Sequence, residues 1–511
     1  MPRIGYRKLL TNAGANSAST MASLAVSFVL APIVLHAIGD ARYGAWSFVE
    51  SFVAYLTLFD FGIAAAIVRF TSRNWARENT EELNRTYSAS MVVFLAAAVI
   101  AIVIGAVFEI LFLQRFLHSP EFGGEIRWLF RLLVFNFAMA LPMSIYSAML
   151  DGLGRFGFKS IVRLCILGLR VPLILLAIRG ENRLVALGCV ITACTLAENI
   201  VLAFGVWRAV PALRFRPRHV DRATLRQMGS YSRDAFTAMI AGRLAFQTDA
   251  FVIAPILGPV AITLFSIPSR LVEMGKSLLR SATTTLTSAF SALEAVDDHD
   301  GIRATFLSCS RAAWYTALPL QFGLLILGYP FLMIWVGPHY ARSCSPVLLT
   351  LAIPLALSIA QSVAARLLYG TGQLRQFARM TLTEGISNIL LSIALVVPFG
   401  VLGVAVGTAI PHIGFCLWVI HRVCCYLDIS ARQYLAVIVK PLIATLVASV
   451  TWSILGSRGI DSWATMFVIG AAGLAIYAVA VTILESVNVL KMIKTRSDKS
   501  LPSPTVLRAA G

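Results

Sequence analysis

The sequence has little charge. Charged residues make up 13% of its 511 residues, whereas hydrophobic residues make up 58%. Soluble domains carry about 25% charged residues, which help to cover the surface that faces water. A soluble fold with the present composition could not cover its surface with polar groups, so the composition predicts an integral membrane protein.

The sequence also lacks the motifs of common enzyme and nucleotide sites. It has no GxxxxGK[ST] loop for phosphate binding, no HExxH zinc motif and no GxSxG nucleophile turn. Its eight cysteines form no CxxC pair and show no Cys/His ligand spacing, which argues against a disulfide framework or a zinc site. These absences predict a protein that is not an enzyme, holds no cofactor or metal and does not use ATP directly.

Long apolar runs are what the sequence has in abundance. A helix needs roughly 20 apolar residues to cross the ~30 Å hydrocarbon core, and about fourteen runs have this length. The runs are centred on residues 12–38, 44–70, 87–113, 127–150, 160–179, 184–207, 230–257, 261–288, 305–336, 346–368, 378–398, 400–421, 433–455 and 463–490. The predicted fold class is therefore an all-α polytopic membrane protein with about fourteen transmembrane helices.

The net charge of +18 is distributed unevenly between the loops. If the N-terminus is cytoplasmic, the loops on the opposite side carry only about seven basic residues. These are Arg42, Arg115, Arg127, Arg179, Arg183, Arg342 and Arg458. Cytoplasmic loops of membrane proteins are enriched in Lys and Arg, so the distribution predicts that both termini are cytoplasmic. It also accounts for the positive charge without nucleic-acid binding.

Two short Gly-x-Gly loops indicate an internal repeat. DGLGRFGFK at 151–159 links the fourth and fifth predicted helices, and YGTGQLRQF at 369–377 links the tenth and eleventh. The glycines of the two loops are Gly152, Gly154, Gly370 and Gly372. Tight turns need glycine for positive φ or for close backbone approach. Because six helices is an even number, two six-helix copies enter the membrane from the same side and form a parallel repeat.

A second match lies in the first helix of each copy. Ala31-Pro32 is followed by an isoleucine, and so is Ala254-Pro255, which predicts a proline kink at matched positions. The repeat predicts five parts of the chain. They are an N-lobe of helices 1–6 at 1–208, a cytoplasmic linker at 209–229, a C-lobe of helices 7–12 at 230–430, helices 13 and 14 at 431–490, and a disordered cytoplasmic tail at 491–511.

Polar side chains inside the apolar runs are the strongest sequence signal for a site. Ionisable groups cost several kcal/mol at the bilayer centre, so they usually face a cavity or a partner. They gather in helices 1, 2, 7 and 8, which predicts a hydrophilic cavity between the lobes. The candidate cavity residues are Asn16, Glu50, Arg243, Gln247, Arg270 and Arg280. An excess of basic groups in helices 7 and 8 suits an anionic substrate such as a phosphate or pyrophosphate. The alternative is internal ion pairing, of Arg270 or Lys276 with Glu273 or of Arg233 with Asp234.

Several stretches together resemble one family. They are IGDARYGAWSF at 38–48, LFDFGIAAAIVR at 58–69, QTDAFVIAPILG at 247–258 and the two Gly-x-Gly loops. With two six-helix copies and an extra helix pair, the chain resembles the polysaccharide transporters over about residues 5–490. These are the Wzx-type lipid-linked oligosaccharide flippases of the multidrug/oligosaccharidyl-lipid/polysaccharide exporter superfamily.

The resemblance implies a protein of the bacterial inner membrane that moves an undecaprenyl-diphosphate-linked oligosaccharide to the periplasmic leaflet by alternating access. The product would be O-antigen of lipopolysaccharide, capsule or exopolysaccharide, and the potential partners are a polysaccharide polymerase and other assembly proteins. The resemblance also implies coupling to H+ or Na+, for which Asp60, Asp249 and Glu273 are the candidates. Arg243, Arg270 and Arg280 become candidate contacts for the diphosphate or for sugar acids.

Three other functions are the alternatives. A small-molecule or drug antiporter of the same superfamily usually has twelve spans, and the extra pair at 433–490 argues against it. A lipid II flippase also has fourteen spans, so the number of spans does not distinguish it from an oligosaccharide flippase. A membrane enzyme such as a polysaccharide polymerase would show a large periplasmic loop, whereas the predicted outside loops are short.

Overall fold

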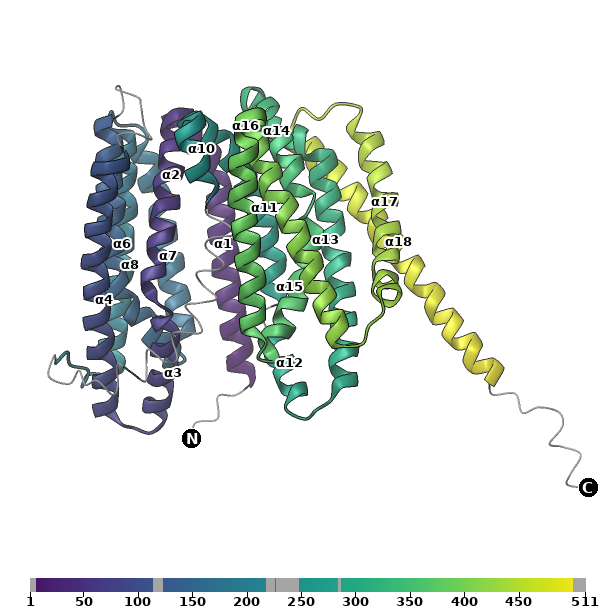
Figure 1. The fold of residues 1–511 in the computed structure, drawn as a ribbon, viewed down its shortest axis with the longest axis horizontal. Helices are drawn as coiled ribbons and strands as arrows, with labels where there is room; N and C mark the ends of the chain where they lie inside the picture. Colours follow the sequence, from purple (N-terminus) through teal and green to yellow (C-terminus); the bar gives the residue numbers. More distant parts are fainter. Residues whose placement is uncertain (1–5, 114–122, 217–225, 227–247, 284–285, 500–511) are drawn as a thin grey trace, which may run out of the picture. The chain divides into compact units, whose positions relative to one another are not determined.

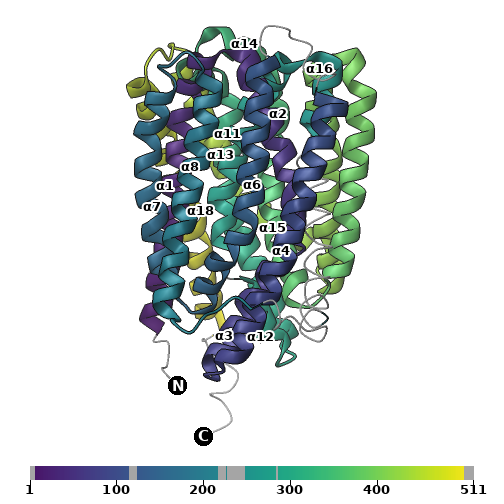
Figure 2. The ribbon, with the colours of Figure 1, turned by 90° about the vertical axis from the view of Figure 1, so that its left-hand side faces the viewer.

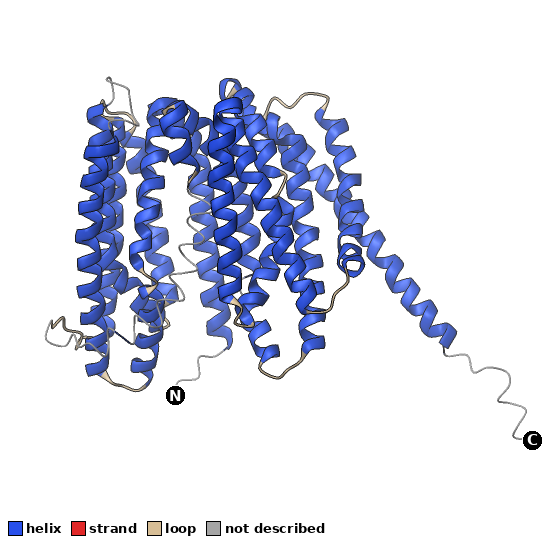
Figure 3. Ribbon diagram, viewed as in Figure 1, coloured by secondary structure: helices blue, strands red, loops and turns tan. Residues whose placement is uncertain are grey.

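The structure is a computed structural model that describes residues 6–113, 123–216, 226, 248–283 and 286–499 (Figure 1). Every regular element among these residues is a helix, and none of them lies in a strand (Figure 3). A helix satisfies all its backbone hydrogen bonds within one segment, which a membrane span requires. The all-α prediction is confirmed.

The predicted spans have helical counterparts. Ten helices among the described residues are long and apolar enough to cross a membrane, and an eleventh candidate is the pair 40–60 and 63–76, bent by 43°. Helix α16 (Leu374–Tyr426) contains two predicted spans, because Gly400 interrupts it with φ 59° and ψ −138°. Helix α11 (Pro259–Thr283) is the eighth predicted span. The seventh, 230–257, lies largely outside the described residues.

The chain divides into two compact units. Unit 1 comprises residues 1–281 and 372–415. Its central helix α6 (Gly123–Gly152) packs against α2 (Asp40–Leu56), α3 (Ile63–Ala76), α4 (Thr80–Phe108) and α8 (Arg183–Ala209). Figure 2 shows α4 beside α6. The remaining elements of unit 1 are α1 (Tyr6–Ile38), η1 (Thr57–Asp60), η2 (Glu109–Leu113), α7 (Phe156–Ala177), α10 (Asp249–Leu257), most of α11 and the first part of α16.

Unit 2 comprises residues 282–371 and 416–511. Its central helix is α13 (His299–Trp335), which packs against α14 (Pro338–Ala352), α15 (Leu355–Gly370), α17 (Ala431–Gly456) and α18 (Trp463–Lys499). The short α12 (Leu286–Glu294) packs against α15. Trp452 of α17 is buried against Gly473 of α18, where a Cβ would collide with its indole ring. This close approach fixes the extra helix pair.

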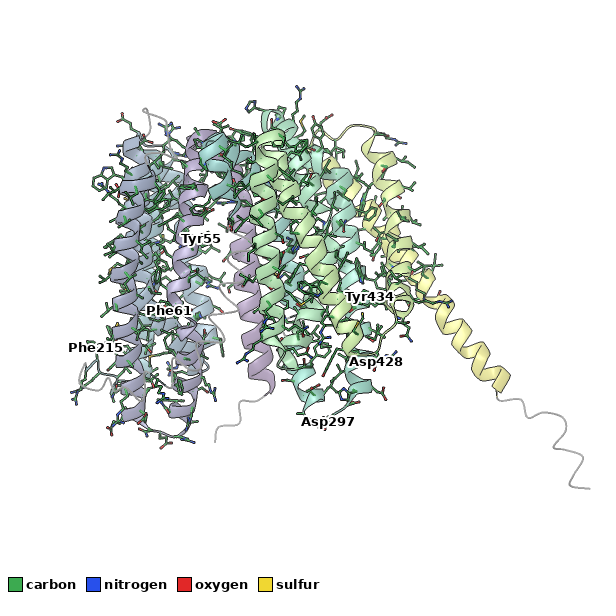
Figure 4. All side chains as sticks on the ribbon, viewed as in Figure 1. Tyr55, Phe61, Phe215, Asp297, Asp428 and Tyr434 are labelled. Atoms are coloured by element: carbon green, nitrogen blue, oxygen red, sulfur yellow. The ribbon has the colours of Figure 1, made fainter. Side chains whose placement is uncertain are left out.

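A break divides the second predicted helix. After η1, Phe61 and Gly62 take positive φ values of 50° and 72°, and α3 then starts in a new direction (Figure 4). Asp60 accepts a hydrogen bond from the backbone N–H of Ala64 over 3.2 Å and so satisfies one free donor at the start of α3. Its visible role in the structure is to cap this helix.

The two Gly-x-Gly loops have the same construction. Gly154 and Gly372, the second glycines, have φ values of 69° and 76°, which an L side chain rarely adopts. The first glycines both sit against a helix. A Cβ on Gly152 would lie 2.8 Å from the Val68 carbonyl oxygen of α3, and one on Gly370 would lie 2.9 Å from the Thr287 carbonyl oxygen of α12. The loops therefore confirm the repeat at the level of the backbone.

The proline match does not fall at equivalent depths. Gly39 and Gly258, with φ 82° and 81°, end the first helix of each copy and align the two copies. Pro32 lies two turns before Gly39, whereas Pro255 lies within one turn of Gly258. The prediction of kinks at matched positions is therefore wrong, because the two Ala-Pro-Ile sequences lie at different distances from the ends of their helices.

Candidate functional site

Helices α2 and α11 of unit 1 cross near their N-terminal ends. Thr263 donates a hydrogen bond from Oγ1 to the carbonyl oxygen of Asp40 over 2.6 Å. Gly44 lies so close to the carbonyl of Pro259 that a Cβ there would overlap it. Thr263 and Gly44 occupy corresponding positions of the two copies, and so do Asp40 and Pro259. One contact is therefore made twice, about a local two-fold axis.

Two serines mark this axis. Ser47 donates a hydrogen bond to Ser266 over 3.4 Å between the two Oγ atoms. The two residues are counterparts in the repeat, and a residue that contacts its own counterpart must lie beside the two-fold axis. The crossing of α2 and α11 is thus a point where the two copies meet in a symmetric way.

Beyond the serines, Glu50 and Arg270 form an ion pair, and the guanidinium of Arg270 also lies over the Tyr43 ring, 5.6 Å from its centroid. The two candidate cavity residues are thereby brought together. Both side chains are about two-fifths exposed, at 41% and 40%. Partial exposure weakens such a pair, so a substrate anion could compete with Glu50 for Arg270. Their role as substrate contacts stays a prediction.

Arg280 and Glu273 form a second pair within α11, with 3.7 Å between Nη1 and Oε1. Their side chains are half exposed, at 47% and 54%. An exposed pair of this kind contributes about 0.2–1 kcal/mol to stability. The structure thus gives Glu273 a basic partner, as the internal-pairing alternative expected, although that partner is Arg280.

Asp249 is the buried carboxylate at the start of α10. It is 8% exposed and accepts a hydrogen bond from Thr408 Oγ1 of α16 over 2.9 Å. The neighbouring Thr248 and the hydroxyl of Tyr55 form a hydrogen bond of 2.6 Å. Asp249 forms no ion pair among the described residues.

A second buried acidic group, Glu384, was not among the predicted site residues. Glu384 and His412, on the two halves of α16, are 2.5 Å apart between Oε1 and Nδ1. Their side chains are only 3% and 7% exposed, and Glu384 Oε2 has no partner in the described part of the chain. Lys276 and Arg280 of α11 lie close enough to act on this pair electrostatically. The sequence could have suggested this pair, because Glu384 lies 14 residues before the turn at 398–400 and His412 lies 12 residues after it.

Two arginines of α7 were missed as well. Arg163 and Arg170 stand seven residues apart in an otherwise apolar helix, which places them on one face. Both are half-buried, and the Nε of Arg170 is a buried donor without an acceptor in the described structure. Two basic residues at this spacing in a predicted span were visible in the sequence alone.

Three candidates cannot be placed. Arg243 and Gln247 lie outside the described residues, and Asn16 lies in α1 where side chains are not described. In the described parts of unit 1, the structure therefore brings together Glu50 with Arg270 and Glu273 with Arg280. No group of three or more His, Cys, Asp or Glu side chains suited to a metal ion occurs among the residues that the structure describes.

Comparison with known proteins adds the family. Residues 9–293, more than half of the chain, match the family model described as "Polysaccharide biosynthesis protein". The chain belongs to this family. One relative of the chain is the "Uncharacterized membrane protein EpsK" of Bacillus subtilis (strain 168), 23% identical over 497 residues that cover 92% of this chain and 94% of the relative.

Solved structures share the fold. A lipid II flippase MurJ in an inward closed conformation superimposes with a TM-score of 0.73 and 15% identity, covering 94% of this chain and all of that one. An inward-facing MATE family multidrug resistance transporter superimposes with a TM-score of 0.67 and 14% identity, covering 81% of this chain and 96% of that one. The family member described here is thus a multi-pass membrane protein with the fold of the multidrug/oligosaccharidyl-lipid/polysaccharide exporter superfamily, a fold of transporters rather than of enzymes.

Proposed function

We propose that this protein is a flippase that moves polyprenyl-diphosphate-linked oligosaccharides across the bacterial inner membrane for surface polysaccharide synthesis. Family membership supports the pathway, and the fold supports transport. The proposal includes cytoplasmic termini, as the distribution of Lys and Arg favours. It also includes a polymerase and other assembly proteins as partners that receive the product.

The observation that carries the proposal is the symmetric crossing of α2 and α11. At the crossing, two hydroxyl contacts and the partly exposed pair Glu50–Arg270 join α2 and α11. These polar groups can exchange partners with water or with an anionic substrate when the helices move apart. A symmetric contact between two copies is a natural place for a gate, because alternating access moves one repeat against the other.

We further propose that a cation, H+ or Na+, drives the cycle through the buried carboxylates. Asp249 with Thr408 and Glu384 with His412 both lie on or against α16 in unit 1. Buried carboxylates bind a proton or a metal ion when no fixed charge pairs with them. Replacing Asp249 by Asn should abolish ion-driven transport but leave substrate binding in place. Equal transport rates for D249N and the wild type in vesicles would remove Asp249 from this role.

A deletion strain tests the substrate. Its lipid-linked glycans are extracted and identified by mass, and a membrane-impermeant sugar label on spheroplasts reports the leaflet that holds them. We expect a complete diphosphate-linked oligosaccharide on the cytoplasmic side and loss of the surface polymer. Normal polymer with no accumulated intermediate, in a strain without a second homologue, would contradict the proposal.

Two other transport functions remain as competitors. The likeness to the multidrug transporter fold favours an ion-coupled small-molecule antiporter, and the likeness to the MurJ fold favours lipid II as the substrate. Drug efflux from the complemented deletion strain would indicate the first. Accumulation of lipid II with arrest of cell-wall synthesis would indicate the second.

A further inference from the structure

Helix α7 carries two arginines that the proposed function does not yet use. Arg163 and Arg170 lie about two and four turns from the Gly154 loop, and Arg170 is therefore about 20 Å into the helix at 1.5 Å per residue. A position so far along a span lies within the hydrocarbon region. Among the described residues no hydrogen bond or ion pair engages either guanidinium.

The two arginines face the protein interior. At ~100° per residue, Arg163 and Arg170 lie within about 20° of one another. The exposed apolar stripe of α7 lies on the opposite side of the helix. It consists of Ile161, Leu164, Leu169 and Leu176, each between 39% and 62% exposed. The arginines therefore cannot be explained as lipid-facing residues that snorkel to the surface.

The helices packed against α7 do not neutralise this charge. Helix α1, which Figure 2 shows beside α7, has no acidic residue between Tyr6 and Ile38. Helix α8 contributes Glu198 at about the level of Arg163, but no ion pair joins them in the described structure. Arg170, two turns deeper, has no acidic residue at its level on α8, where the apolar pair at positions 190 and 191 stands.

An interior arginine without an acceptor is costly, because buried donors normally find partners. The orphaned Nε of Arg170 shows that the described part of the fold supplies none. A planar guanidinium fits the oxygens of a phosphate group through paired N–H donors. The missing partner is therefore best supplied by a ligand that carries phosphate.

We propose that Arg170, with Arg163 one step closer to the Gly154 loop, binds the diphosphate of the lipid-linked substrate during its passage along α7. The inference rests on the proposed function and extends it to a site on the first copy. The seven-residue spacing gives two successive anion positions about 10 Å apart along the helix. Because its Nε is a buried donor without an acceptor in the described structure, Arg170 is the stronger contact.

Binding measurements on the purified full-length protein test the site. Undecaprenyl diphosphate and undecaprenol, which lacks phosphate, are titrated in detergent and followed by native mass spectrometry. We expect R170Q to weaken diphosphate binding by about tenfold or more, and R163Q by less, with no change for the alcohol. R170K should retain part of the affinity, because it keeps the charge but loses the paired donors.

The matched control is R311Q. Arg311 of α13 also stands in a candidate span without an ion pair in the described structure, but it is exposed and lies in unit 2. The substitution removes the same charge, so it should leave binding unchanged. Equal loss in R311Q and R170Q would show a non-specific charge effect and would overturn the site.

A stability measurement separates binding from structure. If Arg170 is kept for a ligand, R170M removes an unsatisfied buried donor and should unfold at the same temperature as the wild type or at a higher one without substrate. A lower unfolding temperature for R170M, with normal diphosphate affinity, would make Arg170 a structural residue and overturn the inference. Failure of the wild type to bind the diphosphate would instead overturn the proposed function as well.

Discussion

The two hairpins that follow the Gly-x-Gly loops share a backbone and differ in chemistry. In the first copy, α7 carries Arg163 and Arg170, whose counterparts in the second copy are Thr381 and Asn388. In the second copy, α16 carries Glu384 and His412, whose counterparts in the first are Ile166 and Cys194. The first hairpin thus has arginines where the second has neutral polar residues, and the second has a Glu–His pair where the first has an isoleucine and a cysteine.

The largest expected effect comes from joining the two copies where they meet. Ser47→Cys with Ser266→Cys should form a disulfide, because the two Oγ atoms are 3.4 Å apart. Oxidation should stop transport almost completely, and reduction should restore it, if α2 and α11 separate in each cycle. Transport is measured in vesicles under both conditions.

The single variants S47C and S266C are the controls for this experiment, since the chain has eight other cysteines. Full activity of the cross-linked double variant, with cross-linking verified by mass, would mean that the crossing is static.

The next effect tests the buried Glu384–His412 pair against the positions that correspond to it in the first copy. His412→Ala leaves the buried Glu384 without its partner and should cost about 3–5 kcal/mol of unfolding free energy. Cys194→Ala, at the corresponding buried position, should cost about 1 kcal/mol. Denaturant unfolding in micelles measures both. The double variant E384L/H412L should recover most of the loss, and a further loss instead would show that the pair stabilises the fold.

A smaller effect tests the likeness of the loops. Gly152→Ala and Gly370→Ala each push a methyl group against a packed helix and should each destabilise by about 1–3 kcal/mol. Gly168→Ala, inside α7 with open space around it, should instead stabilise by about 0.5–1 kcal/mol. Thermal unfolding of the three variants checks this. Markedly different decreases in stability for Gly152→Ala and Gly370→Ala would contradict the structural equivalence of the two loops.

The smallest effect concerns the exposed pair on α11. Arg280→Gln should change the unfolding free energy by less than about 1 kcal/mol, because the pair with Glu273 is half exposed and spans 3.7 Å. Substrate affinity, measured in parallel, decides whether Arg280 has the role in anion binding that the sequence suggested. Unchanged affinity would leave that role to the other basic residues.

Much of the fold could be predicted because membrane spans obey a simple rule. An apolar run of sufficient length must form a helix, and each predicted run other than 230–257 has its helix among the described residues. The Gly-x-Gly loops were also predictable, since positive φ at Gly154 and Gly372 selects glycine. The two prolines do not correspond, because short matches such as Ala-Pro-Ile recur by chance in apolar helices. Gly39 and Gly258 are the better reference points, because their positive φ values mark the ends of the two helices.

The sequence by itself therefore determined the helices, their repeat and the polar residues inside them. Tertiary structure alone decided which polar groups meet: Glu50 with Arg270, Asp249 with Thr408, and Glu384 with His412. It also left Arg170 without an acceptor among the described residues. The reason is that helical periodicity specifies the face on which a side chain lies, while the neighbour of that face depends on how distant helices pack.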